Sequence, residues 1–133
     1  MLASNKPRSL LDGSKVNTSK ALSIINRHEF HHIFPKAYLK SNNYSEIKIN
    51  AHSNICLLNM INNRSISDTK PSIYFKQVRD ELGSNMLEVL NSNFINEEAY
   101  NAAINDDFEV FSEIRSQSII NKAKQLCGET IPV

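Results

Sequence analysis

The run FHHIFP at residues 30–35 constrains the fold of this chain more than any other segment. Its aromatic and β-branched side chains favour extended structure, and Pro35 restricts the residue before it to an extended backbone. Proline also suits the first turn of a helix, so a short helix is expected to begin at Lys36. The sequence therefore predicts a strand that ends close to His32 and is followed at once by a helix.

A second apolar run, ICLL at residues 55–58, predicts a second strand that is buried on both faces or nearly so. The polar stretch between the two runs would then connect two antiparallel strands. Residues 59–67 show no clear period, and a short helix is one interpretation of them. The expected fold class is α+β, with a two-stranded antiparallel hairpin early in the chain and helices after it.

Helix signals follow the second strand. Pro71 opens a helix that Gly83 ends, and Ser84 and Asn96 are candidate caps for the next two helices. Asp106 is the candidate cap of a long final helix that reaches Cys127. The expected apolar stripe of this last helix, interrupted by Arg115, consists of Phe108, Phe111, Ile119, Ala123 and Leu126.

The length of 133 residues suits one domain, and a composition of 41% hydrophobic and 22% charged residues is ordinary for a globular protein. We expect residues 1–20 to form a lead-in segment or arm, because they carry little apolar surface. Residues 21–83 would form the core, and residues 84–133 a helical extension packed on it.

The net charge is only +1, but it is unevenly distributed. Residues 1–40 hold seven Lys/Arg and two Asp/Glu, residues 41–80 hold five and three, and residues 81–133 hold three and nine. A polyanion would be attracted to the first 80 residues and repelled by the rest. The excess is modest, so ordinary solvated faces are the simpler explanation from charge alone.

Cys56 and Cys127 belong to no CxxC pair, so the sequence supports neither a zinc ribbon nor a redox motif. Cys56 lies in an apolar run and is interpreted as a small core residue. The chain has no apolar stretch approaching the roughly 20 residues that span a bilayer, and residues 1–20 lack a signal-peptide core. We therefore expect a cytoplasmic protein with no membrane partner.

Four residues carry the groups that phosphodiester hydrolysis needs. A neutral imidazole can take a proton from water, and imidazole or amide oxygen can hold a divalent cation. His31 and His32 are adjacent, Asn54 lies 22 residues after His32, and Asn63 lies nine residues after Asn54. A histidine pair alone is a weak signal, and single asparagines mean little in a chain with 17 of them. The joint spacing is the specific feature.

These residues resemble a known motif. HHIFP, then NICLL, then Asn63 are similar to the HNH nuclease motif in its ββα-metal arrangement, also called the His-Me finger. The continuation NRSISDTKP at residues 63–71 resembles the C-terminal nuclease domain of GmrSD-like, modification-dependent restriction proteins of bacteria and phage defence. The helical tail, with Asp106, Asp107, Phe108 and Arg115, also resembles that branch.

The resemblance implies a role for each matching residue. His32 matches the general base, His31 and Asn63 match two metal ligands, and Asn54 matches the asparagine that braces the loop carrying the base. The resemblance implies one divalent ion, Mg²⁺ or Mn²⁺, although His31 stands where Asp is frequent and Ni²⁺ or Zn²⁺ would also suit an imidazole. Candidate phosphate contacts are Lys36, Arg64 and Lys70.

One physical condition accompanies these roles. Adjacent residues of an ideal strand point to opposite faces, so both histidines can serve one site only if the strand ends or bends there. Pro35, three residues after His32, favours such an end.

The function that this resemblance implies is metal-dependent DNA endonuclease, acting with an N-terminal nucleotide-binding or sensor domain of the same or a partner chain. Cleavage would leave a 5′ phosphate and a 3′ hydroxyl. Two alternatives remain open: a catalytically inactive nucleic-acid-binding module with the HNH fold, and a toxin nuclease neutralised by an immunity partner.

Overall fold

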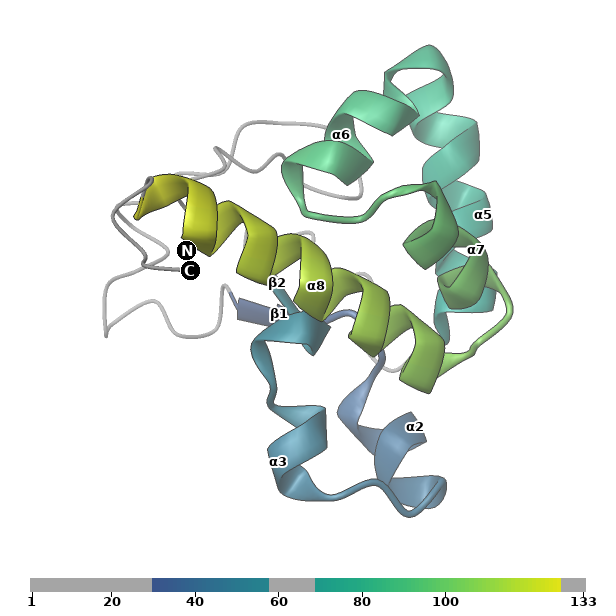
Figure 1. Cartoon of the computed structure of the whole chain (residues 1–133). Coiled ribbons are helices and arrows are strands. Elements are labelled where there is room, and N and C mark those ends of the chain that lie inside the picture. Colours follow the sequence, from purple (N-terminus) through teal and green to yellow (C-terminus); the bar gives the residue numbers. More distant parts are fainter. Residues whose placement is uncertain (1–29, 58–68, 128–133) are drawn as a thin grey trace.

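The computed structural model describes residues 30–57 and 69–127, in which helices surround a small two-stranded sheet (Figure 1). Strand β1 (Phe30–His32) pairs antiparallel with β2 (Ile55–Leu57), and His31 lies opposite Cys56 while His32 lies opposite Ile55. The α+β class and the antiparallel pair of strands are confirmed.

Three short helical elements connect the two strands. They are α2 (Lys36–Ser41), α3 (Glu46–Ile49) and the 3₁₀ turn η3 (His52–Asn54). The helix expected after Pro35 is present, and the Ser45 side chain caps α3 by accepting a hydrogen bond from the Lys48 N–H at 3.3 Å. This connection brings Asn54 back beside the end of β1, where the Asn54 carbonyl accepts a bond from the Ile33 N–H at 2.8 Å.

The helices beyond β2 follow the expected order. Helix α5 (Pro71–Leu82) has proline in its first turn and ends at Gly83, whose φ of 51° lies in the left-handed region. After the 3₁₀ turn η4 (Gly83–Asn85) come α6 (Met86–Ser92) and α7 (Glu97–Ile104), which Asn96 caps by accepting a bond from the Ala99 N–H at 2.8 Å. The Ser84 cap is wrong, because Ser84 lies inside η4 and α6 begins at Met86 without a side-chain cap.

Asp106 also has a different role from the expected one, because it does not cap the last helix. It closes α7 with φ 55°, and its N–H bonds the Ala103 carbonyl at 3.0 Å. A residue in this left-handed conformation ends one helix, so the cap of α8 (Phe108–Leu126) falls to Asp107, which accepts a bond from the Val110 N–H at 3.3 Å. The Asp106 carboxylate instead accepts a bond from the Ser72 N–H in the first turn of α5, at 3.0 Å.

One buried cluster joins the segments before and after residue 83. Helix α8 packs against α7 and η3, and α7 packs against α5. The Phe34 ring lies 5.2 Å from the rings of both Phe108 and Phe111, so the chain just after β1 is anchored directly to α8. Cys56 is buried as expected. Figure 1 shows α8 crossing beside the sheet, with α5 and α7 on one side and α2 and α3 below.

The stripe expected along α8 is only partly correct. Phe108 and Phe111 are buried, but Leu126 is 55% exposed, so the apolar contact fades toward the end of the helix. Arg115, which the sequence placed as an interruption, is itself fully buried. The physical reason lies in the partners of Arg115, which are backbone carbonyls of two other segments.

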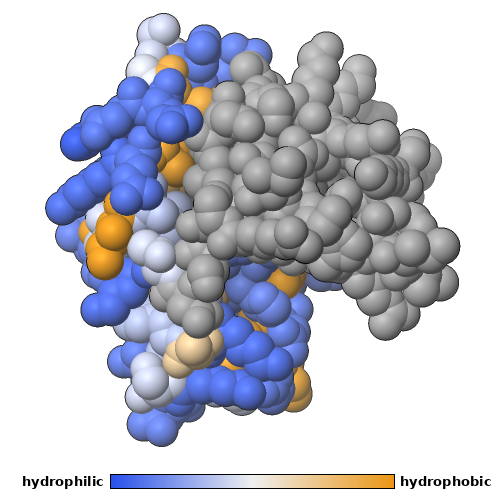
Figure 2. Space-filling view, turned by 180° about the vertical axis from the view of Figure 1, so that it is seen from behind, coloured by the Kyte–Doolittle hydropathy of each residue, from blue (hydrophilic) through white to orange (hydrophobic). Residues whose placement is uncertain are grey.

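The described surface is mostly hydrophilic on the face that Figure 2 presents, with hydrophobic residues scattered across it. Among the described residues, no helix is long and apolar enough to cross a membrane. The expected lead-in at residues 1–20 and the ambiguous segment at 59–67 lie outside the described residues, and the division at residue 83 stays a prediction about organisation.

Replacement of Phe111 by alanine should lower the free energy of unfolding by about 3–5 kcal/mol, because it removes a buried ring and leaves a cavity. Ile47→Ala is the control, since Ile47 is 86% exposed, and it should stay within about 0.5 kcal/mol of the native protein. Urea denaturation followed by circular dichroism measures both variants. Equal stability of the two would show that Phe111 of α8 does not pack against Phe34 as described.

Candidate functional site

The chain leaves the sheet immediately after His32, and the backbone of the next two residues is bonded at every polar group. The Ile33 N–H donates to the Asn54 carbonyl at 2.8 Å, and the Ile33 carbonyl accepts from the Tyr74 hydroxyl at 2.6 Å. The Phe34 N–H donates to Asn54 Oδ1 at 2.7 Å, and the Phe34 carbonyl accepts from Asn54 Nδ2 at 3.1 Å. This turn is therefore held by two residues from distant parts of the chain.

The Asn54 side chain has no solvent exposure, and its amide bonds backbone groups as the backbone of a neighbouring strand would. Besides the two bonds to Phe34, Nδ2 donates to the Ile49 carbonyl at 3.0 Å, at the end of α3. A carboxamide supplies one acceptor and two donor hydrogens, which matches these three backbone partners. The side chain thus ties the end of β1 to the α3 connection. Its role in catalysis stays a prediction.

Tyr74 on α5 completes the turn. Sequence reasoning missed this residue, because the pattern of residues 71–82 gives no sign of a partner for its hydroxyl. Burial raises the pKa of the Tyr74 hydroxyl well above its ordinary value, so the group remains a donor to the Ile33 carbonyl. The same ring meets the His31 imidazole edge-on, with 6.4 Å between centroids.

The two histidines differ in exposure. His31 is 4% exposed and lies opposite the buried Cys56, whereas His32 is only partly buried and lies opposite Ile55. Neighbouring strand residues point to opposite faces, which accounts for the difference. Strand β1 ends at His32, but both histidines lie within it, so their convergence on one site stays a prediction.

An asparagine orients the His32 ring. His32 Nε2 lies 2.8 Å from Asn50 Oδ1, and Asn50 Nδ2 donates to Glu46 Oε2 at 3.2 Å. Because the carboxylate takes the amide hydrogen, the amide oxygen faces the imidazole, and Nε2 must carry the ring hydrogen. Nδ1 is then the nitrogen with a lone pair in neutral His32.

Two lysines hold the Glu46 carboxylate in turn. Lys40 Nζ lies 3.2 Å and Lys36 Nζ 3.6 Å from its oxygens, and the Lys40 hydrogen bond is the main reason that the pKa of Glu46 is lowered. Sequence reasoning missed Glu46 and Asn50. The only signal was their i, i+4 spacing on one short helix and its cap, which is too common to single out.

The described residues include only part of the expected metal site. His31 offers one imidazole, a donor that suits a divalent transition metal. Within residues 30–57 and 69–127, no group of three or more His, Cys, Asp or Glu side chains could hold a metal ion. The second expected ligand, Asn63, and the candidate phosphate contact Arg64 lie outside the described residues. The described residues therefore supply one ligand of the expected pair, and the metal stays a prediction.

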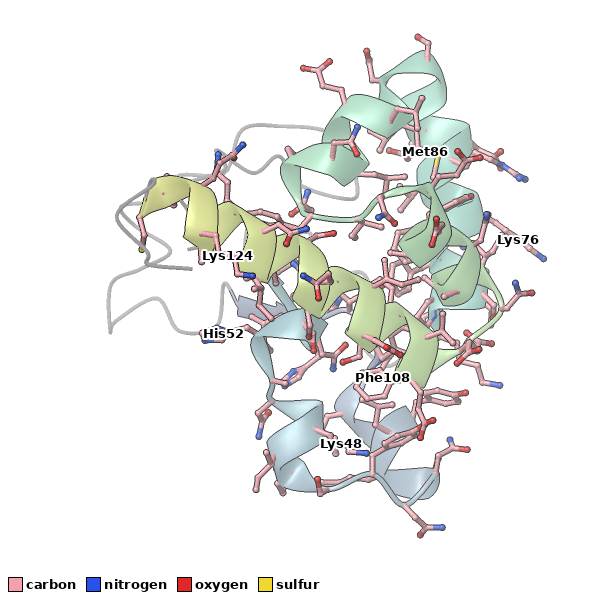
Figure 3. The ribbon with its side chains drawn as sticks, in the orientation of Figure 1. Lys48, His52, Lys76, Met86, Phe108 and Lys124 are labelled. Carbon is pink, nitrogen blue, oxygen red and sulfur yellow. The ribbon has the colours of Figure 1, made fainter. Side chains whose placement is uncertain are left out.

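Two of the candidate phosphate contacts, Lys36 and Lys70, lie within the described residues and on neighbouring surfaces. Lys36 is exposed at the start of α2, and Lys70 is exposed just before α5. The Lys70 ammonium lies 5.5 Å from the centre of the Tyr38 ring on α2, which links the two positions. Figure 3 shows two further basic side chains, Lys48 on α3 and His52 on η3.

Comparison with known proteins finds one distant relative. An uncharacterized protein of Methanocaldococcus jannaschii is 30% identical over 119 residues, which cover 74% of this chain. The chain spans only 20% of the length of that relative. No protein-family model matches the sequence, and no solved structure matches.

Asn54→Ala should destabilise the protein strongly, because each buried backbone group left unpaired costs about 1–3 kcal/mol. Asn50→Ala, at an exposed position, should stay within about 0.5 kcal/mol of the native protein. Urea titration measures both. An Asn54→Ala protein as stable as Asn50→Ala would mean that the amide does not hold the turn.

Asn54→Asp tests the same bonds by pH. The carboxylate would face the Phe34 and Ile49 carbonyl oxygens, so folding would raise the pKa of the introduced group. A raised pKa in the folded state means that the penalty is small below the unfolded pKa of about 3.9 and grows as the pH rises above it. The stability deficit relative to the native protein should be larger at neutral than at acidic pH. A deficit that does not change with pH would contradict this geometry.

Proposed function

We propose that this chain is a metal-dependent DNA endonuclease domain of the HNH type, with a ββα-metal core built on β1 and β2. The observation that carries the proposal is the braced end of β1. His32 is the last residue of the strand, it keeps part of its surface exposed, and the next two residues are fixed by Asn54 and Tyr74. A rigid backbone beside an accessible imidazole is what a positioned general base needs.

The residues support one reaction sequence. Asn50 holds the hydrogen on His32 Nε2, so Nδ1 takes the proton from a water molecule. The water oxygen bonds the phosphorus, the bond from phosphorus to the 3′ oxygen breaks, and the leaving oxygen takes a proton from solvent, so the products carry a 5′ phosphate and a 3′ hydroxyl. A divalent ion, held by His31 and Asn63, would supply positive charge beside the phosphate and the leaving oxygen. His31 lies on the neighbouring strand position and is buried, which suits a ligand more than a base.

DNA is the proposed substrate because two candidate phosphate contacts, Lys36 and Lys70, lie on or beside α2, the helix that follows the strand end. Lys36 is the first residue of α2, Lys70 lies against the Tyr38 ring of the same helix, and both belong to the first 80 residues, which carry the positive excess. We propose further that a nucleotide-binding or sensor domain, in the same or a partner chain, controls the cleavage. The greater length of the archaeal relative is compatible with such an arrangement.

His32→Ala should reduce the rate of DNA cleavage by about 10²–10⁴-fold, the usual effect of losing a general base. The assay follows the nicking of supercoiled plasmid in the presence of Mn²⁺ or Mg²⁺. His52→Ala is the matched control, because its imidazole is exposed on η3 and it should cut close to the native rate.

Two outcomes would contradict the proposal. Undiminished cleavage by a folded His32→Ala protein would remove His32 from the reaction. If the native protein binds DNA but does not cut it with any of the metals, the chain is an inactive binding module instead. Circular dichroism of each variant confirms that folding is intact.

The metal preference follows from the ligands. His31 and Asn63 are both neutral, so they attract Mg²⁺ weakly, whereas imidazole favours Mn²⁺ and later transition metals. Calorimetric titration of DNA-free protein should show tighter binding of Mn²⁺ than of Mg²⁺. His31→Asp should narrow this difference by adding a charged oxygen ligand. Tight Mg²⁺ binding by the native protein, or Mn²⁺ affinity that does not respond to His31 and Asn63 substitutions, would place the site elsewhere.

A further inference from the structure

Helix α8 contacts the segment before Asn54 through two polar side chains, one turn apart on the helix. Ser112 Oγ lies 2.7 Å from Ser53 Oγ, and Arg115 Nη1 donates to the His52 carbonyl at 2.9 Å. His52, Ser53 and Asn54 make up η3, so both contacts hold the short turn from which the Asn54 side chain projects.

Burial of the charged Arg115 side chain costs free energy, so stabilising the fold does not by itself explain this residue. Its side chain is fully buried, Nε donates to the Asn93 carbonyl at 3.0 Å, and no described residue accepts a bond from Nη2. Burial lowers the pKa of Arg115 to about 10, so the group is still charged at neutral pH. A buried charge with incomplete partners stabilises a fold less well than a packed apolar side chain. What Arg115 does well is to fix two carbonyl groups in place.

We propose that Arg115 and Ser112 are positioning residues, which hold η3 so that Asn54 reaches the backbone of Phe34 and fixes the end of β1 at His32. This inference rests on the proposed nuclease function and extends it, because it makes the C-terminal helix part of the catalytic machinery. A displacement of η3 by about one ångström would take the Asn54 bonds to Phe34 beyond hydrogen-bonding distance. Such a displacement would move His32 without unfolding the protein.

The first test observes Asn54 directly by NMR. The variants are Ser112→Ala, which removes one hydroxyl, and Arg115→Lys, which keeps the charge but cannot span both carbonyls. In each, the Asn54 side-chain amide hydrogens should exchange with solvent about tenfold faster than in the native protein. Leu82→Ala is the control, since Leu82 is a buried residue at the far end of α5 and its loss lowers stability without touching η3.

The second test separates positioning from stability in catalysis. At a temperature where all variants are folded by circular dichroism, Ser112→Ala and Arg115→Lys should lower kcat for plasmid nicking by about tenfold or more with KM nearly unchanged. Leu82→Ala should keep the native kcat. A purely structural role would leave kcat of the folded variants unchanged.

The outcomes separate this inference from the proposed function. If Asn54 exchange in Ser112→Ala and Arg115→Lys is no faster than in Leu82→Ala, α8 does not position η3 and the inference is wrong. If the exchange accelerates but the native protein cuts no DNA, the coupling stands and the nuclease function is wrong. If kcat of all three variants follows thermal stability alone, positioning is contradicted.

Discussion

The buried carboxamide of Asn54 is the interaction on which the rest of this structure depends. Backbone groups that leave a sheet inside a protein must find new partners, and here the chain turns away from a strand of three residues. Asn54 supplies both its own carbonyl and its side chain to the two residues that follow His32. The Phe34 ring can then enter the aromatic cluster on α8, and α2 can begin after Pro35.

This constraint explains why the candidate site is spread over the whole described chain. The strand end carries the histidines, α3 and its cap orient His32 through Asn50, α5 contributes the Tyr74 hydroxyl, and α8 reaches η3. The strand itself is too short to be rigid alone, so its position is determined by side chains from other elements. The helices after residue 83, which the sequence presents as an extension, therefore share one hydrophobic core with the strands that carry the proposed site.

The sequence predicted element boundaries correctly where a local signal has a single structural interpretation. Pro35, Gly83 and Asn96 marked boundaries that the structure has, and the two apolar runs formed the two strands. It failed where the partner is distant. Asp106 resembled a cap of the next helix, but it closes the previous one and bonds α5 instead. Arg115 looked like an interruption, and no sequence signal singled out the Tyr74 hydroxyl, because their carbonyl partners lie 22 to 63 positions away in the chain.

The central claim is that a water molecule activated at His32 breaks the bond between phosphorus and the 3′ oxygen of DNA. The most direct measurement is the chemistry of the cut ends. Plasmid nicked by the native protein with Mn²⁺ should be resealed by DNA ligase without prior end treatment, because ligase requires a 5′ phosphate and a 3′ hydroxyl. Nicks that ligase cannot seal until a 3′ phosphate has been removed, or the absence of any nicks, would contradict the account.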